Sequence, residues 1–220
     1  MDTNKSNLVR IGYWLGVIGV IQFIILTIIA MFTYPGGYSF THNFFSSLGR
    51  MSSANNHMPS IASRIIFIIA CTITAIMNIP FGLALRTNLK DTMSEKILSW
   101  IGTILSIGST PFLFLLSIFP ADVRFGPHML ATRLFFLLFG LGVIIYTPAF
   151  FLSKRYNKVV ASYGILVAIM AILYMSLFIF NALFQKFTIY MMILWVIVQG
   201  VYLLKRKESE IKRLYNSRTF

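Results

Sequence analysis

The sequence predicts an all-α integral membrane protein, a bundle of six transmembrane helices with both termini in the cytoplasm. First, the 220 residues are 57% hydrophobic and only 11% charged, whereas a soluble domain usually carries about 25% charged residues. Second, the hydrophobic residues form six long runs, and a helix needs about 20 such residues to cross the hydrocarbon core. Third, the basic residues gather in alternate connections between these runs, as expected of cytoplasmic segments.

The six predicted spans follow one another with short connections, apart from one long loop. In chain order they cover residues 11–33, 60–85, 97–119, 129–153, 159–184 and 187–204. A capping box at residues 92–95 (Thr-Met-Ser-Glu) predicts a clean start for the third span, and Gly126-Pro127 suits the first turn of the fourth. Only Gln185 and Lys186 separate the last two spans, which predicts a tight antiparallel pair.

The Lys and Arg residues set the predicted orientation. Of the 19 in the chain, 14 fall in segments assigned to the cytoplasm and 5 in outer segments when both termini are placed inside. The chain therefore divides into a cytoplasmic N-terminus (1–10), a six-helix transmembrane domain (11–204) with a long outer loop (34–59), and a basic cytoplasmic tail (205–220). A net charge of +13 carried by such short segments favours lipid headgroups over nucleic acid as the partner. The expected location is the cell membrane.

Two sets of small residues predict close helix packing inside the bundle. Gly12, Gly16 and Gly19 share one face of the first span, and Gly102 and Ser106 repeat the four-residue spacing in the third. Such residues let helix backbones approach closely, and this packing drives helix association inside a membrane.

No Asp, Glu, Lys or Arg lies deep within any predicted span. This argues against an ion-coupled transporter or a proton pump, which generally need ionisable residues at membrane depth. The most polar groups there are Asn78, Ser109, Thr110 and Gln199. A pore lined by these four would favour a passive permease.

The outer loop 34–59 is much longer than a connection requires, and long loops in compact domains are usually functional or disordered. Its aromatic residues argue against disorder. Phe44, Leu48 and Met51 are spaced i, i+4 and i+7, which predicts a short amphipathic helix that lies on the bilayer or caps the bundle. The other side of that helix would turn four polar residues to water or to a pocket: Asn43, Ser46, Ser47 and Arg50.

All three histidines, and the only acidic residue outside the predicted cytoplasmic segments, fall in outer segments. His42 and His57 lie in the first outer loop, and Asp122 and His128 lie between the third and fourth spans. Because the chain contains so few polar groups, their position on one side predicts a candidate site on the outer face.

Two motifs in these segments resemble a known family. Residues 46–49 (Ser-Ser-Leu-Gly) follow the first span, and residues 119–122 (Phe-Pro-x-Asp), with His128, follow the third. With the helix number and loop placement, they are similar to the multi-pass family catalogued as domain of unknown function 998. That family is in turn distantly similar to DRAM-type and GPI-anchor-remodelling membrane proteins. The family's serine is usually followed by an acidic residue, where this chain has Ser47. The resemblance implies the architecture and makes Asp122 and His128 the stronger site candidates, but it implies no activity.

Two catalytic hypotheses follow from the outer polar residues. In the first, His42, His57 and His128, with Asp122, bind a divalent metal such as zinc, which supplies hydroxide at neutral pH. In the second, Ser46 or the serine after it is the nucleophile, activated by His128 and oriented by Asp122. Either enzyme, a hydrolase or a transferase, would act on a lipid or a lipid-linked substrate, because the site lies at headgroup depth. Outside the metal hypothesis no cofactor is predicted.

A third hypothesis needs no reaction. Arg50 and Arg124, with Asn43 and the histidines, bind an anionic lipid headgroup, or the same groups only join the two outer segments by hydrogen bonds. The sequence favours a non-catalytic membrane protein that binds or senses lipid at its outer face. The lipid enzyme is the alternative and a passive permease the third choice. Membrane lipids are the expected partners, nucleic acid is not, and formation of a homo-oligomer is left open.

Overall fold

The computed structural model describes residues 3–176 and 181–216, which form six α-helices and one short 3-10 helix. In chain order these are α1 (Thr3–Phe32), η1 (Phe45–Gly49), α2 (Ile61–Arg86), α3 (Met93–Ile118), α4 (Phe125–Leu152), α5 (Lys158–Ser176) and α6 (Ala182–Asn216). Each of the six α-helices is long and apolar enough to cross a membrane. No β-strand occurs among the described residues. The predicted all-α fold is confirmed, and the chain is a multi-pass membrane protein.

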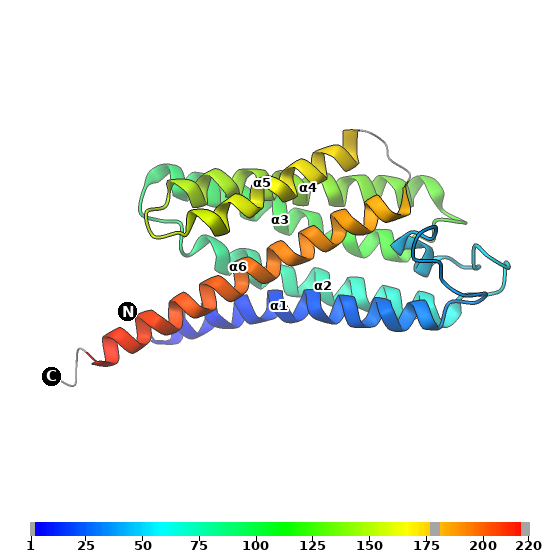
Figure 1. Ribbon diagram of the computed structural model, residues 1–220, viewed down its shortest axis with the longest axis horizontal. Coiled ribbons are helices and arrows are strands. Elements are labelled where there is room, and N and C mark those ends of the chain that lie inside the picture. Colours follow the sequence, from blue (N-terminus) through cyan, green and yellow to red (C-terminus); the bar gives the residue numbers. More distant parts are fainter. Residues whose placement is uncertain (1–2, 177–180, 217–220) are drawn as a thin grey trace.

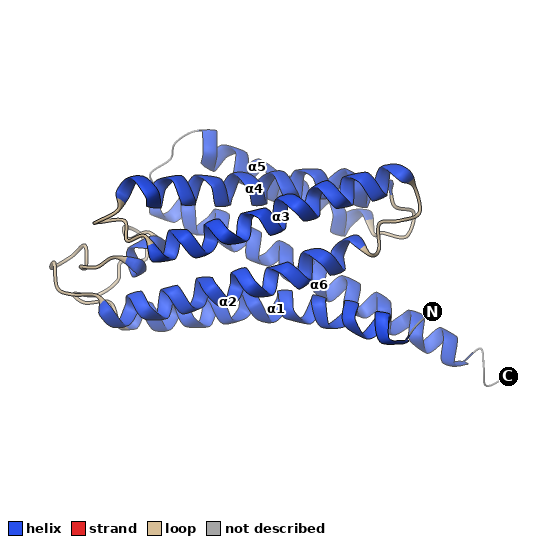
Figure 2. Cartoon of the chain, turned by 180° about the vertical axis from the view of Figure 1, so that it is seen from behind, coloured by secondary structure: helices blue, strands red, loops and turns tan. Residues whose placement is uncertain are grey.

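The helices pack in a closed ring. α1 and α2 lie side by side along one side of the molecule, α3, α4 and α5 lie along the other, and α6 crosses between them diagonally (Figure 1). Each helix packs against its neighbour in the chain, and α6 also packs against α1, which closes the ring. The connections before α2 and before α4 lie together at one end, here called the loop end. Both termini lie at the opposite end, here called the terminal end (Figure 2).

The glycines predicted to mediate close helix packing lie at helix contacts. A Cβ added at Gly16 would lie 2.3 Å from the ring of Phe81, and one added at Gly12 would lie 2.7 Å from a backbone oxygen of α2. Between α3 and α4, a Cβ added at Gly142 would lie 3.3 Å from the carbonyl oxygen of Gly102. The α1–α2 and α3–α4 pairs therefore owe their close approach to residues without side chains.

An aromatic cluster joins the two sides of the ring. Trp195 of α6 is almost completely buried. Its ring centroid lies 6.5 Å from that of Phe81 in α2, 6.1 Å from that of Phe139 in α4 and 6.2 Å from that of Tyr146 in α4. One side chain thus connects three helices.

The predicted boundary between the last two spans is wrong. Gln185 and Lys186 lie inside α6 and are buried, not in a connection. The helix begins earlier because Asn181 caps it, with Oδ1 accepting the N–H of Phe184 at 3.0 Å. Residues 177–180, part of the predicted fifth span, lie outside the described residues.

The predicted capping box at the start of α3 forms only in part. Thr92 Oγ1 accepts the N–H of Glu95 at 3.2 Å, as expected. The Glu95 carboxylate, however, accepts the N–H of Asp91 at 3.2 Å and not that of Thr92. The cap therefore reaches one residue further into the α2–α3 connection.

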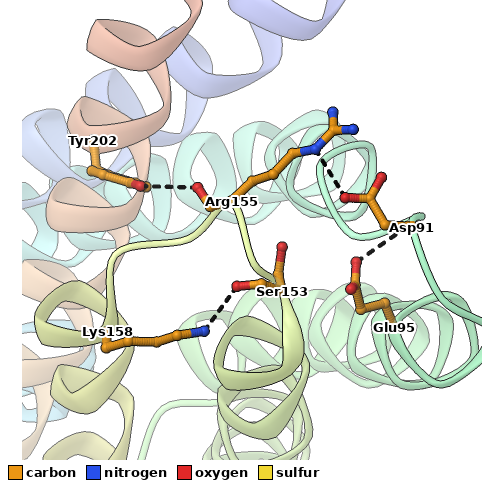
Figure 3. A network of polar contacts seen from close by, with 6 residues as sticks. All are labelled: Asp91, Glu95, Ser153, Arg155, Lys158 and Tyr202. Atoms are coloured by element: carbon orange, nitrogen blue, oxygen red, sulfur yellow. Dashed lines mark hydrogen bonds and ion pairs between the residues drawn. The ribbon is translucent and has the colours of Figure 1, made fainter.

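Polar contacts hold the connections together at the terminal end (Figure 3). Arg155 Nε lies 3.0 Å from Asp91 Oδ2, which joins the α4–α5 connection to the α2–α3 connection. Lys158 Nζ donates to the carbonyl of Ser153 at 2.8 Å, just after α4, where helix carbonyls lack partners within the helix. Tyr202 of α6 donates to the carbonyl of Arg155 at 3.5 Å. α6 is thereby tied to the α4–α5 connection, and through the Arg155–Asp91 pair to the α2–α3 connection.

Candidate functional site

The 3-10 helix η1 closes the loop end of the bundle. Its buried residues Phe45 and Leu48 are three positions apart, which matches the repeat of a 3-10 helix. The predicted amphipathic helix, with its apolar side formed by residues four apart, is therefore wrong in its register, and Met51 is 45% exposed. Ser63 of α2 donates from Oγ to the carbonyl of Leu48 at 3.2 Å. η1 contacts α1, α2, α3 and α6, which agrees with the alternative prediction that this segment caps the bundle.

Two consecutive residues of α6 hold η1 and the chain before it. Gln185 Oε1 accepts the N–H of Phe45 at 3.0 Å. Lys186 Nζ donates to the carbonyl of Asn43 and lies 5.3 Å from the ring centroid of Tyr38 and 5.6 Å from that of Phe45. An ammonium over aromatic faces gains a cation–π attraction that compensates part of its burial. The sequence interpretation missed both residues, although a Gln-Lys pair inside an apolar run was a usable signal.

Asn43, predicted to bind substrate, organises the loop. Its side chain is buried, and Oδ1 accepts the N–H of Ser39 at 2.7 Å. Its carbonyl accepts the hydroxyl of Tyr38 at 3.0 Å as well as the Lys186 ammonium. Burial raises the pKa of Tyr38, so this hydroxyl remains a donor.

Asp122 fixes the long loop to the α3–α4 connection. Its Oδ1 accepts the N–H of Met51 at 3.1 Å and its Oδ2 accepts the N–H of Ser52 at 2.9 Å. Partial burial alone would raise the pKa of Asp122. The two amide hydrogen bonds and the nearby charge of Arg50 outweigh burial and hold the pKa below its usual value.

His128, in the first turn of α4, caps the end of α3. The side chain is buried, and Nδ1 lies 3.0 Å from the carbonyl oxygen of Leu116 and 2.9 Å from that of Phe119. Because both neighbours are acceptors, Nδ1 carries the proton and donates it. The imidazole thus satisfies carbonyls that have no partner within α3.

The other two histidines lie in the exposed part of the loop. His42 Nδ1 lies 3.0 Å from Ser39 Oγ and 2.8 Å from Thr41 Oγ1, and His57 has a positive φ of 58° at a turn. Among the described residues, no three His, Cys, Asp or Glu side chains form a group that could hold a metal ion. The structure does not bring His42, His57 and His128 together.

The members of the nucleophile hypothesis are likewise separate. Ser46 is half-buried and lines the cavity described below. Asp122 and His128 are occupied by backbone groups. Within residues 3–176 and 181–216, no hydrogen bond links any two of these three side chains.

The two outer arginines remain at the surface of the loop end. Arg50 Nε donates to the carbonyl of Ser52 at 3.3 Å, on the same turn that Asp122 binds. Arg124 is exposed and immediately precedes α4.

Replacing Asp122 with asparagine is expected to loosen residues 51–59 without unfolding the bundle. The side-chain nitrogen of asparagine cannot accept a hydrogen bond, so one of the two backbone N–H groups, of Met51 or Ser52, loses its acceptor. The other N–H then donates to a neutral oxygen instead of a carboxylate. Asp122 is partly exposed, so the loss is about 1 kcal/mol, or about five-fold faster amide exchange of Met51 and Ser52. Hydrogen–deuterium exchange with mass spectrometry measures this, with Asp91→Asn at the terminal end as the matched control.

The same contact predicts an acid dependence. A carboxylate whose pKa is lowered by folding contributes stability fully above its unfolded pKa of about 4, and loses it as pH falls through the folded value. In the wild type, the protection of residues 51–59 from hydrogen exchange should therefore decrease at acid pH, once the rates are corrected for the pH dependence of exchange in an unfolded chain. The Asp122→Asn variant should lack this change, and an identical acid response in both proteins would contradict the assignment.

Beneath η1 lies a cavity between the helices. It has about 900 Å³ of space not filled by atoms, including the part that opens to the outside. Among the described residues, five α-helices and η1 contribute to its wall, and α5 contributes none. The lining residues include Phe45, Ser46, Cys71, Leu113, Thr132 and Gln185.

The wall of the cavity is almost entirely apolar. No Asp, Glu, Lys, Arg or His is among its lining residues. Three of its polar side chains, those of Thr74, Ser109 and Thr110, donate to carbonyls of their own helices. Ser109 Oγ donates to the carbonyl of Ser106 at 2.6 Å, and Thr110 Oγ1 to that of Ile107 at 2.8 Å. The surface left for a ligand is therefore mainly hydrocarbon.

Three of the four residues predicted to line a pore do line this cavity, namely Asn78, Ser109 and Thr110. The fourth, Gln199, lies nearer the terminal end, where it accepts the hydroxyl of Tyr156. The four therefore do not share one wall, as the permease hypothesis required.

Comparison with known proteins gives one match. Residues 17–202 match the family model described as Protein of unknown function (DUF998). No curated protein and no solved structure matches the chain. The more distant similarity to DRAM-type and GPI-anchor-remodelling proteins stays a prediction. The matched region contains all six apolar helices in whole or in part, both loop-end motifs and every cavity-lining residue except Gly16. The chain belongs to the DUF998 family, and it is a multi-pass membrane protein.

Proposed function

We propose that this protein binds a membrane lipid and holds one acyl chain of that lipid in the cavity beneath η1. The observation that carries the proposal is an apolar, charge-free cavity between the helices of a membrane protein. Ligand pockets in proteins have mainly hydrophobic walls with a small number of polar groups. An apolar cavity of this kind favours hydrocarbon over water.

The length of the cavity supports the same ligand. Along α6 its lining residues run from Gln185 to Val196. At 1.5 Å per residue this is about 16 Å, or about half of the ~30 Å hydrocarbon core. One lipid chain occupies about that depth within its own leaflet.

The loop end supplies the surroundings that a lipid headgroup would meet. Arg50 and Arg124 lie there, and Ser46 contributes to both η1 and the cavity wall. Asp122 and His128 form hydrogen bonds that hold the loop end together, so each has a structural role. The proposed binding therefore needs no chemical step.

The test is to fill the cavity. Leu113 of α3 lines it and is 8% exposed, so Leu113→Trp places a larger ring in the space. We expect a photoactivatable phosphatidylcholine, with a diazirine on its acyl chain, to label cavity peptides of the wild-type protein in nanodiscs. Accommodating the extra ring costs about 1–3 kcal/mol, so labelling of these peptides should fall at least about five-fold in the variant.

The matched control is Ile104→Trp, on the same helix but 63% exposed and facing outward. It should leave labelling of the cavity peptides unchanged. Cys71 offers a second measurement, because it is the only cysteine of the chain and lines the cavity. Bound lipid should slow its reaction with a membrane-permeant thiol reagent. The proposal would be contradicted if the probe labelled only residues that face the surrounding lipid, and if Leu113→Trp and Ile104→Trp gave the same labelling.

A further inference from the structure

One hydroxyl in the cavity wall has no partner. Thr132 lies two turns into α4 from the loop end and is 7% exposed, and its Oγ1 makes no hydrogen bond with the described residues. Thr147 on the same helix behaves in the usual way, with Oγ1 donating to the carbonyl of Val143 at 2.8 Å. A buried hydroxyl left unpaired costs about 1–3 kcal/mol. Thr132 is one of the residues that line the cavity, so the unpaired hydroxyl lies beside the space that a ligand would fill.

A second free hydroxyl lies at the same end of the cavity. Ser46 belongs to η1, which closes the loop end, and its Oγ makes no hydrogen bond among the described residues. Deeper in the cavity, Thr74 Oγ1 donates to the carbonyl of Ala70 at 2.8 Å and Ser109 Oγ to that of Ser106 at 2.6 Å. The two hydroxyl groups without a hydrogen bond in the described part of the chain, those of Thr132 and Ser46, therefore lie toward the loop end of the cavity.

The cavity has no group that could neutralise a charge. No ionisable acid or base lines it apart from the thiol of Cys71. Lys186 follows the lining residue Gln185, but its ammonium is engaged by the carbonyl of Asn43 and the rings of Tyr38 and Phe45. A carboxylate or an ammonium bound inside would be buried without a partner, at a cost of several kcal/mol.

From these three observations we infer that the part of the ligand inside the cavity is an uncharged long-chain amphiphile, of the long-chain alcohol or acylglycerol class, and that any charged headgroup lies outside the cavity at the loop end. Its hydroxyl or ester group hydrogen-bonds with Thr132 near the loop end, and its chain extends toward the middle of the bundle. This inference rests on the proposed function and names the ligand class for the same cavity.

The experiment compares three probes with the same 16-carbon chain and the same mid-chain diazirine. One is a primary alcohol, one a carboxylate used at pH 9, and one a plain hydrocarbon. Full-length protein in phosphatidylcholine nanodiscs is titrated with each, and labelling of the cavity peptides of α3 and α4 is measured by mass spectrometry. The wild type should label at the lowest concentration with the alcohol.

The decisive variant is Thr132→Val, which keeps the shape and removes the hydroxyl. One hydrogen bond contributes about 0.5–1.5 kcal/mol, so the half-saturating concentration of the alcohol should rise about 2- to 12-fold. The hydrocarbon titration should not change. Thr147→Val, which removes a hydroxyl that is bonded within α4, should change neither titration.

A purely structural Thr132 would behave differently. Removing an unpaired hydroxyl should leave the melting temperature unchanged or raise it, whereas loss of a structural hydrogen bond would lower it. Equal labelling by alcohol and hydrocarbon, with no effect of Thr132→Val, would overturn the inference and leave lipid binding intact. Equal labelling by carboxylate and alcohol would overturn the uncharged class. If no probe labels the cavity peptides, the proposed function itself fails.

Discussion

Replacing Gly16 with valine is expected to destabilise the protein by about 3 kcal/mol, at the upper end of the cost of overpacking a core. A Cβ at this position would lie 2.3 Å from the ring of Phe81. That ring cannot give way easily, because Phe81 is fully buried and packs against Trp195. α1 would have to move away from α2, and the contact between the first two helices would be lost along much of their length.

The measurement is thermal unfolding in detergent, followed by the fraction of protein that remains monodisperse. Gly108→Ala is the matched control, because a Cβ there meets nothing within 4 Å. Alanine in place of glycine inside a helix stabilises by about 0.5–1 kcal/mol, so the control should melt at the same temperature or slightly higher. A Gly16→Val protein as stable as the wild type would show that α1 and α2 pack differently.

Replacing Trp195 with alanine should destabilise the protein by about 3–5 kcal/mol, the usual loss for a large buried aromatic residue. Trp195 is 2% exposed and contacts Phe81, Phe139 and Tyr146. In a membrane the cost comes chiefly from lost packing, because lipid would solvate the exposed surface as well as the protein interior does. The three surrounding rings would line a void that they cannot fill without moving their helices.

Trp14 provides the comparison. It is 48% exposed on α1, so Trp14→Ala removes an indole that faces lipid and should change the melting temperature little. Equal destabilisation by the two alanine variants would contradict the role given to Trp195. Because Val196 and Phe139 line the cavity, Trp195→Ala should also broaden the range of chain shapes that the cavity accepts.

The features predicted correctly from the sequence are those set by local pattern. The six helices follow from the length and apolarity of their runs, and the contact at Gly16 follows from a spacing that repeats on one face. The positions of Gln185 and Lys186 could not be predicted in this way. Their burial depends on partners about 140 residues earlier in the chain, Asn43 and Phe45.

The candidate site was predicted only in outline. The sequence predicted Asp122 and His128 on the same side as the long loop, and both lie at the loop end. It could not show that backbone groups of neighbouring segments occupy both side chains. The cavity depends on which side chains of five helices face one another, and no single run of sequence contains that information. The cytoplasmic location of both termini stays a prediction from the distribution of basic residues.

α6 is a single uninterrupted helix from Ala182 to Asn216, which makes it about 50 Å long. Near one end, Gln185 and Lys186 bind η1 and the chain before it, and near the other end Glu208 lies 3.9 Å from Arg10 of α1. The segment that closes the cavity is therefore attached to the same helix that continues into the basic tail. A ligand that displaces η1 must either break the contacts of Gln185 and Lys186 or move α6. If α6 moves, the position of the basic tail changes with the occupancy of the cavity.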